Sequence, residues 1–289
     1  MGFEWSQDDI SVADGFLRIA REQVGKAIAG AENTQESPER RVHEARRRCK
    51  KLRALFRLVR PDFDAYDTEN AFVRDAARGL AQARDMRVVR GTLVELMQWA
   101  DRPIELDLGG GAEVEVAGLS RFAEQMRSLE QRSQAWRVGR IDIDTLAAGL
   151  KQTYRRGRWT KRLAEKHRTD EAFHEWRKYA KYHWNQLGLL EDCAGDILPS
   201  AHKSAGDLAE LLGQHHDLAI LDQLLATTPE ALGAAVDVGF AREAAARRQR
   251  EHETRIAALG AQVFAETPTA LKARFVAYLD GWAQRQAAE

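Results

Sequence analysis

The sequence is poor in cysteine, with only Cys49 and Cys193 in 289 residues. Two cysteines at this separation match no metal-binding spacing and no disulfide framework. Cys49 lies among apolar residues of a helical pattern, so we expect a buried, reduced thiol of the kind found in the reducing cytoplasm. We therefore predict a cytoplasmic protein without a metal site, and no motif in the chain calls for a cofactor.

The chain also lacks net charge and long apolar runs. Lys and Arg together number 44, as do Asp and Glu. A nonspecific nucleic-acid binder is usually basic overall, so this balance disfavours a nucleic-acid partner. No signal peptide is visible and no apolar run approaches the roughly 18 residues of a membrane span, so we expect no membrane association. Any anion site must come from local segregation of charge. Residues 40–60 hold ten Arg or Lys against one Glu, and residues 151–168 hold eight against one.

Proline is scarce too, and five of the six prolines lie at or near the ends of helical patterns, where proline is tolerated. The patterns predict an all-α protein. The expected helices are 9–30, 39–60, 68–83, 86–101, 118–138, 143–168, 171–191, 199–213, 217–226, 230–265 and 268–287. The exception is 103–117, where Ile104–Leu108 and Glu113–Val116 alternate with period two across three glycines. This alternation predicts one small β-hairpin.

An internal duplication organises the chain. A His-x-x-Arg-x-x-x-Lys spacing beginning at His43 recurs at His174, an offset of 131. A second block, residues 80–89, matches residues 212–221 at an offset of 132. Two blocks at nearly one offset predict two homologous halves, 1–140 and 141–289. Short connections favour antiparallel helical bundles, which we expect to pack about a pseudo-twofold axis and to share a groove or pore.

Basic residues gather on one face of the first duplicated helix. At 100° per residue, five of them fall within an arc of roughly 80°: His43, Arg46, Lys50, Arg53 and Arg57. An apolar stripe that includes Val42, Cys49 and Phe56 runs beside them. Cations along the edge of a buried face are typical of a site that binds an extended polyanion, because Arg offers a planar fork of donors to phosphate oxygens.

The second copy keeps part of this face, with His174, Arg177 and Lys181, but its distal half has lost the cations. The preceding helix carries four cations spaced 4, 3 and 4 residues apart: Lys151, Arg155, Arg158 and Arg162. Such spacing puts them on one face. For these four, a ligand role and a solvated surface remain about equally supported.

The segment 215–217, His-His-Asp, resembles a metal-binding cluster, but the aligned segment 83–85 supplies no ligand set. We therefore interpret Asp85 and Asp217 as N-caps of the next helices, and His216 as a weak cationic position at the rim of the site. Trp176 and Trp184 are expected in the core. We find no Gly-rich phosphate loop, nucleophile elbow or catalytic carboxylate pair.

At these residues the chain resembles the CHAD family, the conserved-histidine α-helical domain. His43-x-x-Arg46-x-x-x-Lys50 fits the first copy of the family pattern, and His174 with the later LGQHHDL fits the second. The second copy departs from the pattern at Trp184, where a basic residue often stands. The resemblance covers essentially the whole chain as one CHAD domain. It implies two pseudo-symmetric helical bundles around a basic central channel that binds long-chain inorganic polyphosphate. No Glu-x-Glu-x-Lys strand marks a fused triphosphate-tunnel domain, which implies the stand-alone binding module.

We therefore expect a non-enzymatic protein that binds inorganic polyphosphate and is recruited to polyphosphate granules. The expected contacts are His43, Arg46, Arg47, Lys50, Arg53, Arg57, Lys151, Arg155, Arg158, Arg162, His174, Arg177, Lys178, Lys181 and His216. Two alternatives stay open: a Mg²⁺-dependent enzyme acting on polyphosphate or triphosphate, and a nucleic-acid-binding module. Glu44 and Glu175 are the carboxylates near the cations, and each is expected to form a salt bridge one turn away.

Overall fold

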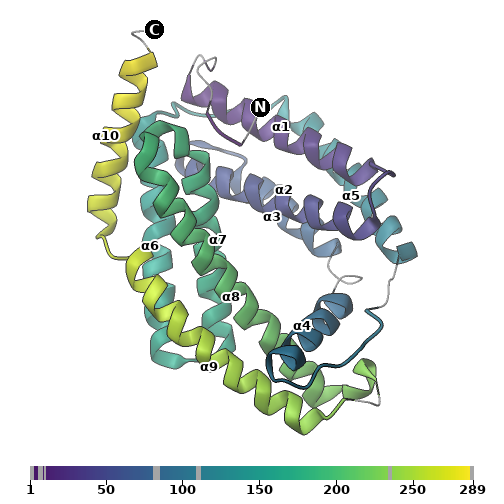
Figure 1. Ribbon diagram of the computed structural model, residues 1–289. Helices are drawn as coiled ribbons and strands as arrows, with labels where there is room; N and C mark the ends of the chain where they lie inside the picture. The colour runs from purple at the N-terminus through teal and green to yellow at the C-terminus, as the bar shows by residue number, and fades with distance from the viewer. Residues whose placement is uncertain are drawn as a thin grey trace.

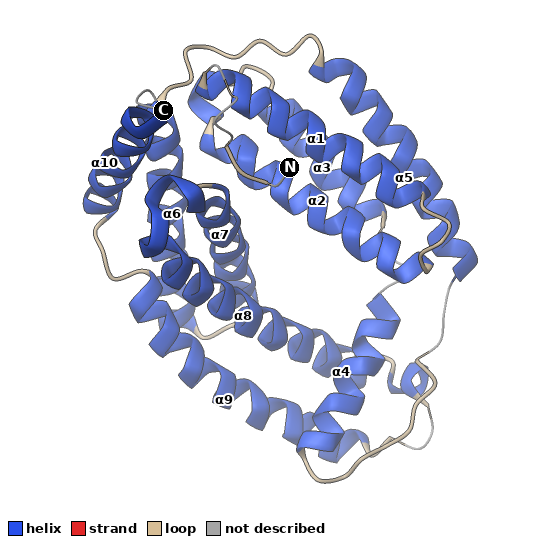
Figure 2. Cartoon of the chain, turned by 45° about the horizontal axis from the view of Figure 1, so that its top comes forward, coloured by secondary structure: helices blue, strands red, loops and turns tan. Residues whose placement is uncertain are grey.

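The computed structural model describes residues 3–5, 9, 11–80, 85–108, 112–233 and 236–286. Within these residues the chain is all-α, as predicted, and contains no β-strand (Figure 2). The helices are α1 (Val12–Glu32), α2 (Pro38–Leu58), α3 (Tyr66–Gly79), α4 (Asp85–Trp99), α5 (Ala112–Ser133), α6 (Ile143–His167), α7 (Asp170–Leu189), α8 (Leu198–Thr227), α9 (Val238–Val263) and α10 (Pro268–Gln286). Three short 3₁₀ segments, Arg60–Asp62, Glu191–Ile197 and Pro229–Leu232, lie between them.

Side-chain caps fix the start of the two duplicated helices, α2 and α7. Ser37 accepts a hydrogen bond from the backbone N–H of Arg40 at 3.4 Å, and Pro38 follows it in the first turn of α2. Thr169 accepts one from the N–H of Ala172 at 3.3 Å at the start of α7. Each cap satisfies a backbone donor that has no partner inside the helix. The cationic faces therefore begin within the first two turns of well-defined helices.

The helices pack in two groups that meet through α2, α6 and α7. α1 packs against α2 and α5, and α2 also contacts α3, α6 and α7. α6 packs against α7 and α10, α7 against α8, and α8 against α9. Figures 1 and 2 show most of α4 apart from α1, α2, α3 and α5, and α4 packs against α8 and α9 instead. Its link to α2 is an ion pair, in which Arg87 donates to Glu39 at 2.5 Å.

Two hydrophobic cores hold this arrangement together. The larger runs through both sequence halves and includes Phe16 and Phe56 from α1 and α2 and Trp176 from α7, all fully buried. The smaller joins α4 to α8 and α9 through buried residues such as Leu93 and Leu221. Because both cores draw residues from 1–140 and from 141–289, the halves are packed as one body.

The connection between the halves lies against the end of α2. Gly139 donates its N–H to the carbonyl of Asp62 at 2.8 Å, and the hydroxyl of Thr145 donates to the Asp62 carboxylate at 2.9 Å. A Cβ at Gly149 of α6 would lie 2.0 Å from the carbonyl oxygen of Leu58. Glycine is therefore required at this crossing, which brings the C-terminal end of α2 directly onto α6.

The predicted β-hairpin at 103–117 is wrong. Residues 102–108 form no regular secondary structure, and α5 begins at Ala112, so Glu113–Val116 are helical. The proposed glycine turn at 109–111 lies outside the described residues. The alternation at 104–108 is real, because Ile104 and Leu106 are half-buried against the smaller core while their neighbours are exposed. The alternation therefore arises because one side of this segment packs against a helical core, and not because the segment pairs with another strand.

The predicted break between 213 and 217 is also wrong, because α8 runs unbroken from Leu198 to Thr227. Asp217 therefore lies inside a helix and does not cap one. The helix continues because Leu211 and Leu212 are buried in the larger core and Leu218 and Leu221 in the smaller one. Asp85 is the first residue of α4, but its side chain lies outside the described part of the structure.

Candidate anion-binding site

The cationic face of α2 lies at the edge of the larger core. Val42, Cys49 and Phe56 are buried on the adjacent face. Arg46, Lys50, Arg53 and Arg57 are half-buried, whereas His43 and Arg47 are exposed. Half-buried guanidinium groups have lost part of their hydration, and an anionic ligand would offset that cost.

Burial shifts the pKa values of several groups on this helix, including Cys49 and Arg53. Cys49 is a free, buried cysteine, as predicted. Burial raises the pKa of its thiol to about 12. Burial also lowers the pKa of Arg53 from its ordinary value. Arg keeps its charge at neutral pH in either environment. The α2 face therefore presents a partly desolvated positive charge beside an apolar core.

Contacts between α2 and α7 bring the ends of the two duplicated helices together. The side-chain amide of Gln186 donates to the carbonyl of Ala54 at 3.1 Å inside the buried interface. The guanidinium groups of Arg57 and Arg53 lie 4.2 and 5.6 Å from the centre of the Tyr182 ring. Arg53 also donates to the amide oxygen of Asn70 on α3 at 3.1 Å. Two cations of the first half are therefore positioned by an aromatic ring of the second.

The cationic face of α7 is lined by α8. The Nδ1 atoms of His174 and His216 lie 3.3 Å apart. A Cβ built at Gly213 would lie 3.8 Å from Nε of Arg177 and 4.0 Å from Nζ of Lys181. The missing side chain at Gly213 thus leaves room for both cations against the α8 backbone. The structure brings four predicted residues together here, His174, Arg177, Lys181 and His216.

Trp184 continues this face, and its predicted burial is wrong. Its side chain is 37% exposed, and its ring stacks on His202 of α8 at 5.9 Å between centroids. Trp176, by contrast, is fully buried as predicted. Trp184 is exposed because it lies 7 residues after Arg177 and so falls on the cationic face, whereas Trp176 falls on the core face.

The imidazoles near α8 are not cationic in the free protein. Burial, and next the charge of Arg177, lowers the pKa of His216 to about 3. Burial, and next Lys178, lowers the pKa of His174. Both rings are therefore neutral at pH 7, which corrects the prediction that His216 supplies a weak positive charge. They offer hydrogen-bonding groups beside the fixed charges of Arg177 and Lys181.

The two glutamates near the cations form the predicted salt bridges. Glu44 contacts Arg47 at 2.9 Å and also Arg48, and Glu175 contacts Lys178. Burial disfavours ionised Glu44, but Arg48 and Arg47 outweigh it and lower the pKa of its carboxyl group. Among the described residues there is no group of three His, Cys, Asp or Glu side chains placed to hold a metal ion.

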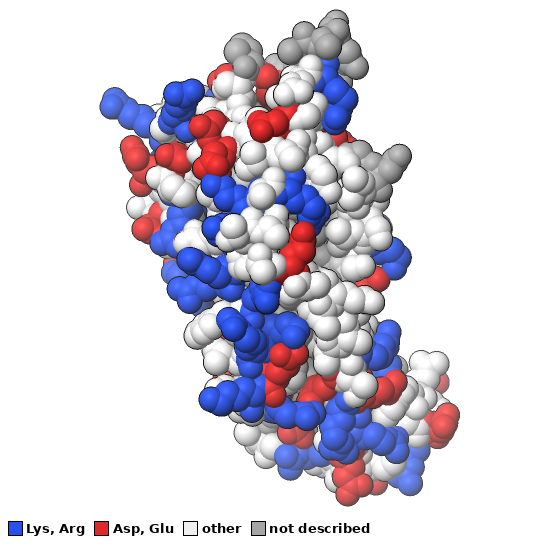
Figure 3. Space-filling view, turned by 90° about the vertical axis from the view of Figure 1, so that its left-hand side faces the viewer, with Lys and Arg blue, Asp and Glu red and all other residues white. Residues whose placement is uncertain are grey.

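The α6 stripe is placed differently from the α2 and α7 faces. Arg158 donates to the backbone carbonyl of Glu266, in the connection between α9 and α10. Lys151 is half-buried, and Arg155 and Arg162 are exposed. The surface of Figure 3, over α6, α9 and α10, mixes basic and acidic side chains rather than forming a uniform basic patch. Arg158 thus has a structural contact with the connection before α10, while the exposed Arg155 and Arg162 fit the solvated interpretation of this stripe.

Several residues of the site escaped the sequence analysis. Asn70, Tyr182 and Gly213 carry no charge, so a search for cations does not find them. For Asn70 the sequence does hold a signal, which is its position relative to His202. Asn70 and His202 stand 132 residues apart, and each contacts a residue of its own cationic helix, Arg53 or Trp184.

None of the helices in the described residues combines the length and the apolar composition needed to cross a membrane. A comparison with curated proteins found no match. The family model of the CHAD domain matches residues 18–226, from within α1 to the end of α8, which is well over half of the chain and includes both His-containing helices. The chain therefore belongs to the CHAD domain family.

Proposed function

We propose that this protein binds long-chain inorganic polyphosphate along the cationic faces of α2 and α7, without transforming it. The observation that carries the proposal is the contact of Arg53 and Arg57 with Tyr182, because it places the end of the α2 cationic face against α7, the helix that carries the second set of cations. A ligand that follows both faces must be long. The cations of α2 alone extend about 20 Å along the helix, at 1.5 Å per residue.

The chemistry of the faces suits phosphate oxygens. Arg46, Arg53 and Arg57 supply planar donor groups that keep their charge. Lys50 and Lys181 supply compact cations. Because net charge is zero for the whole chain, attraction for a polyanion has to be local, and the half-buried position of these side chains strengthens each interaction by excluding solvent.

The pseudo-twofold architecture is part of the same proposal. Arg53 and Trp184 occupy equivalent positions at an offset of 131, and their partners Asn70 and His202 at an offset of 132. Equivalent contacts in the two halves support two homologous bundles related by symmetry. On this basis we propose that the two faces line one basic channel, and that the protein reaches polyphosphate granules by binding their polymer.

A catalytic role has weaker support. Transfer of phosphoryl groups normally needs Mg²⁺ held by carboxylates next to the phosphates. Glu44 and Glu175 are instead engaged by Arg and Lys side chains within one turn. We therefore propose a binding protein rather than an enzyme. Phosphate release from polyphosphate that requires Mg²⁺ and disappears in Glu44→Gln would contradict this.

One observation favours nucleic acid as a second candidate ligand. Trp184 is exposed on the α7 face, and single-stranded nucleic acids stack their bases on aromatic rings beside cations. We therefore include competition with single-stranded oligonucleotides. These oligonucleotides should displace labelled polyphosphate poorly. Efficient displacement would favour nucleic acid as the ligand instead.

The decisive experiment is calorimetry with size-defined polyphosphate at two salt concentrations. Affinity should fall steeply with salt, because condensed counterions are released on binding. Two double variants, Arg177→Gln with Lys181→Gln and Arg53→Gln with Arg57→Gln, should each weaken binding by at least about tenfold, since each removes two charge-assisted contacts. They should also reduce the salt dependence.

The matched control is Arg250→Gln with Arg255→Gln, which removes the same charge from two exposed positions of α9. It should bind polyphosphate like the parent protein. If both site variants retain the parent affinity while the controls behave as expected, the assignment of the site is wrong. Circular dichroism and thermal melting of every variant separate loss of the site from loss of the fold.

A further inference from the structure

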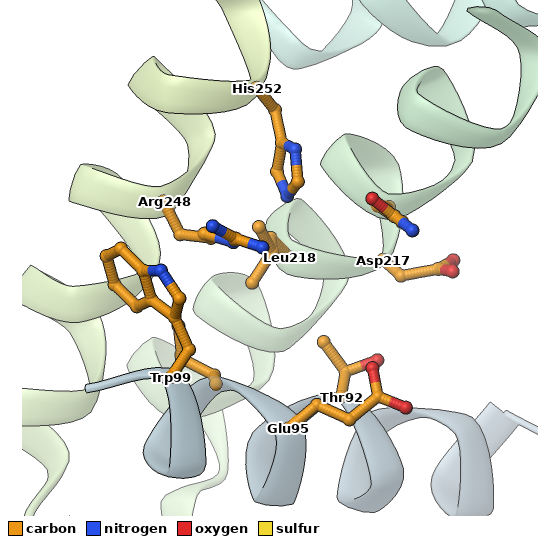
Figure 4. A pocket seen from close by; sticks show the side chains of 9 residues that line it. Thr92, Glu95, Trp99, Asp217, Leu218, Arg248 and His252 are labelled. Atoms are coloured by element: carbon orange, nitrogen blue, oxygen red, sulfur yellow. The ribbon is translucent and has the colours of Figure 1, made fainter. Parts of the chain in front are cut away.

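A cavity with a volume of about 140 Å³ lies between α4, α8 and α9, at the smaller core (Figure 4). One buried water needs roughly 10–15 Å³ of such space, so the cavity has room for a ligand of about ten non-hydrogen atoms. The predicted phosphate-contacting residues do not line it. The proposed polyphosphate site therefore does not explain the residues that line this cavity.

His252 of α9 projects into this cavity (Figure 4) and is only 3% exposed. Its Nδ1 atom is buried and has no hydrogen-bond partner in the structure. Burial, and next Arg248, lowers the pKa of this imidazole to about 4, so the ring is neutral at pH 7. Nδ1 is enclosed by the protein, so a ligand in the cavity would contact the other part of the ring, which lines the cavity.

Arg248, one turn before His252, forms the cationic side of the cavity. Its guanidinium lies 4.9 Å from the centre of the Trp99 ring and donates to Glu251 at 2.7 Å. Arg247 lies 4.7 Å from the same ring. The aromatic contact and the ion pair hold the Arg248 side chain in place. One wall thus combines a positioned guanidinium, a neutral imidazole and a flat apolar surface.

Glu95 of α4 and Asp217 of α8 stand on the opposite side, away from Arg248 and Trp99 (Figure 4). Glu95 is exposed and Asp217 is half-buried. The hydroxyl of Thr92 lies beside them and is already used within its helix, donating to the carbonyl of Val88 at 2.9 Å. The cavity is therefore dipolar, with donors on α9 and carboxylates on α4 and α8.

We propose that this cavity binds a small zwitterion, a free α-amino acid. The carboxylate of the ligand lies at Arg248 and His252, its ammonium group at Glu95 and Asp217, and its side chain against Trp99. A simple anion would be repelled by the two carboxylates. A metal ion alone is disfavoured, because the described residues contain no set of three side chains placed to ligate one. A ligand with both charges complements both walls.

The test uses the full chain and a panel of free amino acids: glycine, L-alanine, L-threonine, L-glutamine and L-leucine. For each, the N-acetyl derivative lacks the ammonium charge and the corresponding primary amine lacks the carboxylate. We expect at least one amino acid to raise the melting temperature saturably and to give a calorimetric isotherm at millimolar concentration. Its two derivatives should bind at least about tenfold more weakly.

Variants of both walls complete the test. Arg248→Gln and Glu95→Gln should each weaken binding of the amino acid by at least about tenfold, whereas Arg250→Gln, an exposed neighbour on α9, should not change it. Glu95 is exposed, so its variant tests the site even if Arg248→Gln disturbs the fold.

The proposal is overturned if no member of the panel binds, if the derivatives bind as well as the amino acid, or if Glu95→Gln binds like the parent. Polyphosphate binding should be the same in these variants. Failure of this proposal is thereby distinguished from failure of the phosphate site.

Discussion

His174 and His216 are joined through their Nδ1 atoms, 3.3 Å apart, with ring centroids 4.3 Å apart. One ring must donate and the other accept, because two Nδ1–H groups cannot face each other at this distance. The pair can therefore take up one proton and keep its hydrogen bond, with the imidazolium as donor. A second proton would break the contact. Arg177 and Lys181, which face His216 from α7, oppose the first proton in the free protein.

A bound polyanion reverses that balance, so polyphosphate binding should be coupled to proton uptake. The pKa values of both imidazoles are lowered in the free protein, and nearby phosphate charge should raise them. Affinity should then increase as pH falls from 7 to about 5.5, with uptake approaching about one proton. Calorimetry in two buffers of different ionisation enthalpy measures this number. His216→Asn should remove most of the uptake, whereas His167→Asn, an exposed control at the end of α6, should remove less. An uptake unchanged in His216→Asn would contradict the prediction.

The cationic faces could be predicted from sequence because they are properties of single helices. The 3.6-residue period fixes which side chains of α2 share a face, whatever α2 packs against. The burial of Cys49 and the salt bridges of Glu44 and Glu175 follow from the same period. The exposure of Trp184 follows from it as well, because Trp184 lies 7 residues after Arg177 on the cationic face. The prediction that Trp184 is buried rested on its residue type and did not use this period.

The predictions that were wrong depend on contacts between residues that lie far apart in the sequence. The alternation of Ile104 and Leu106 indicates a surface buried on one side, and sequence cannot say whether a strand or a helical core covers it. Gly213 suggests a break, but buried leucines on both sides keep α8 continuous. The dipolar cavity could not be predicted from sequence, because Trp99, Asp217 and Arg248 come from three separate helices.

Gly213 offers a direct test of the space beside the cations. A Cβ at this position would be in ordinary van der Waals contact with Arg177 and Lys181. Gly213→Ala should therefore stabilise α8 by about 0.5–1 kcal/mol, because glycine is unfavourable inside a helix, and should bind polyphosphate like the parent. Gly213→Leu should fill the space and weaken binding by about tenfold or more, the loss of one charge-assisted contact. Chemical denaturation and calorimetry measure the two effects. A leucine variant that is folded and binds normally would show that ligand does not enter here.

The contact of Tyr182 with Arg53 and Arg57 should matter for both stability and binding. Tyr182→Leu removes the ring on which the two guanidinium groups lie, and we expect a loss of about 1–3 kcal/mol in the free energy of unfolding. Polyphosphate affinity should fall as well, because the arginines lose their fixed positions. Tyr182→Phe keeps the ring and is the matched control, with a cost below about 1 kcal/mol. Equal polyphosphate affinity of the leucine and phenylalanine variants would show that the ring of Tyr182 does not contribute to binding.

Acid should destabilise the protein through His183, which is 3% exposed and packs between Tyr154 and Phe264, with ring centroids 5.2 and 5.8 Å away. Burial lowers the pKa of His183 to about 3, against an ordinary value of 6.5. Because the folded pKa lies below the unfolded one, the unfolded chain binds the proton first. Stability is therefore retained above pH 6.5 and lost as pH falls toward 3. Between pH 7 and pH 5 this group alone should cost about 2 kcal/mol. Urea denaturation at the two pH values should show that His183→Leu, although less stable at pH 7, loses about 2 kcal/mol less than the parent on acidification. An equal loss in both proteins would mean that His183 is already protonated in the fold or that another group controls the acid transition.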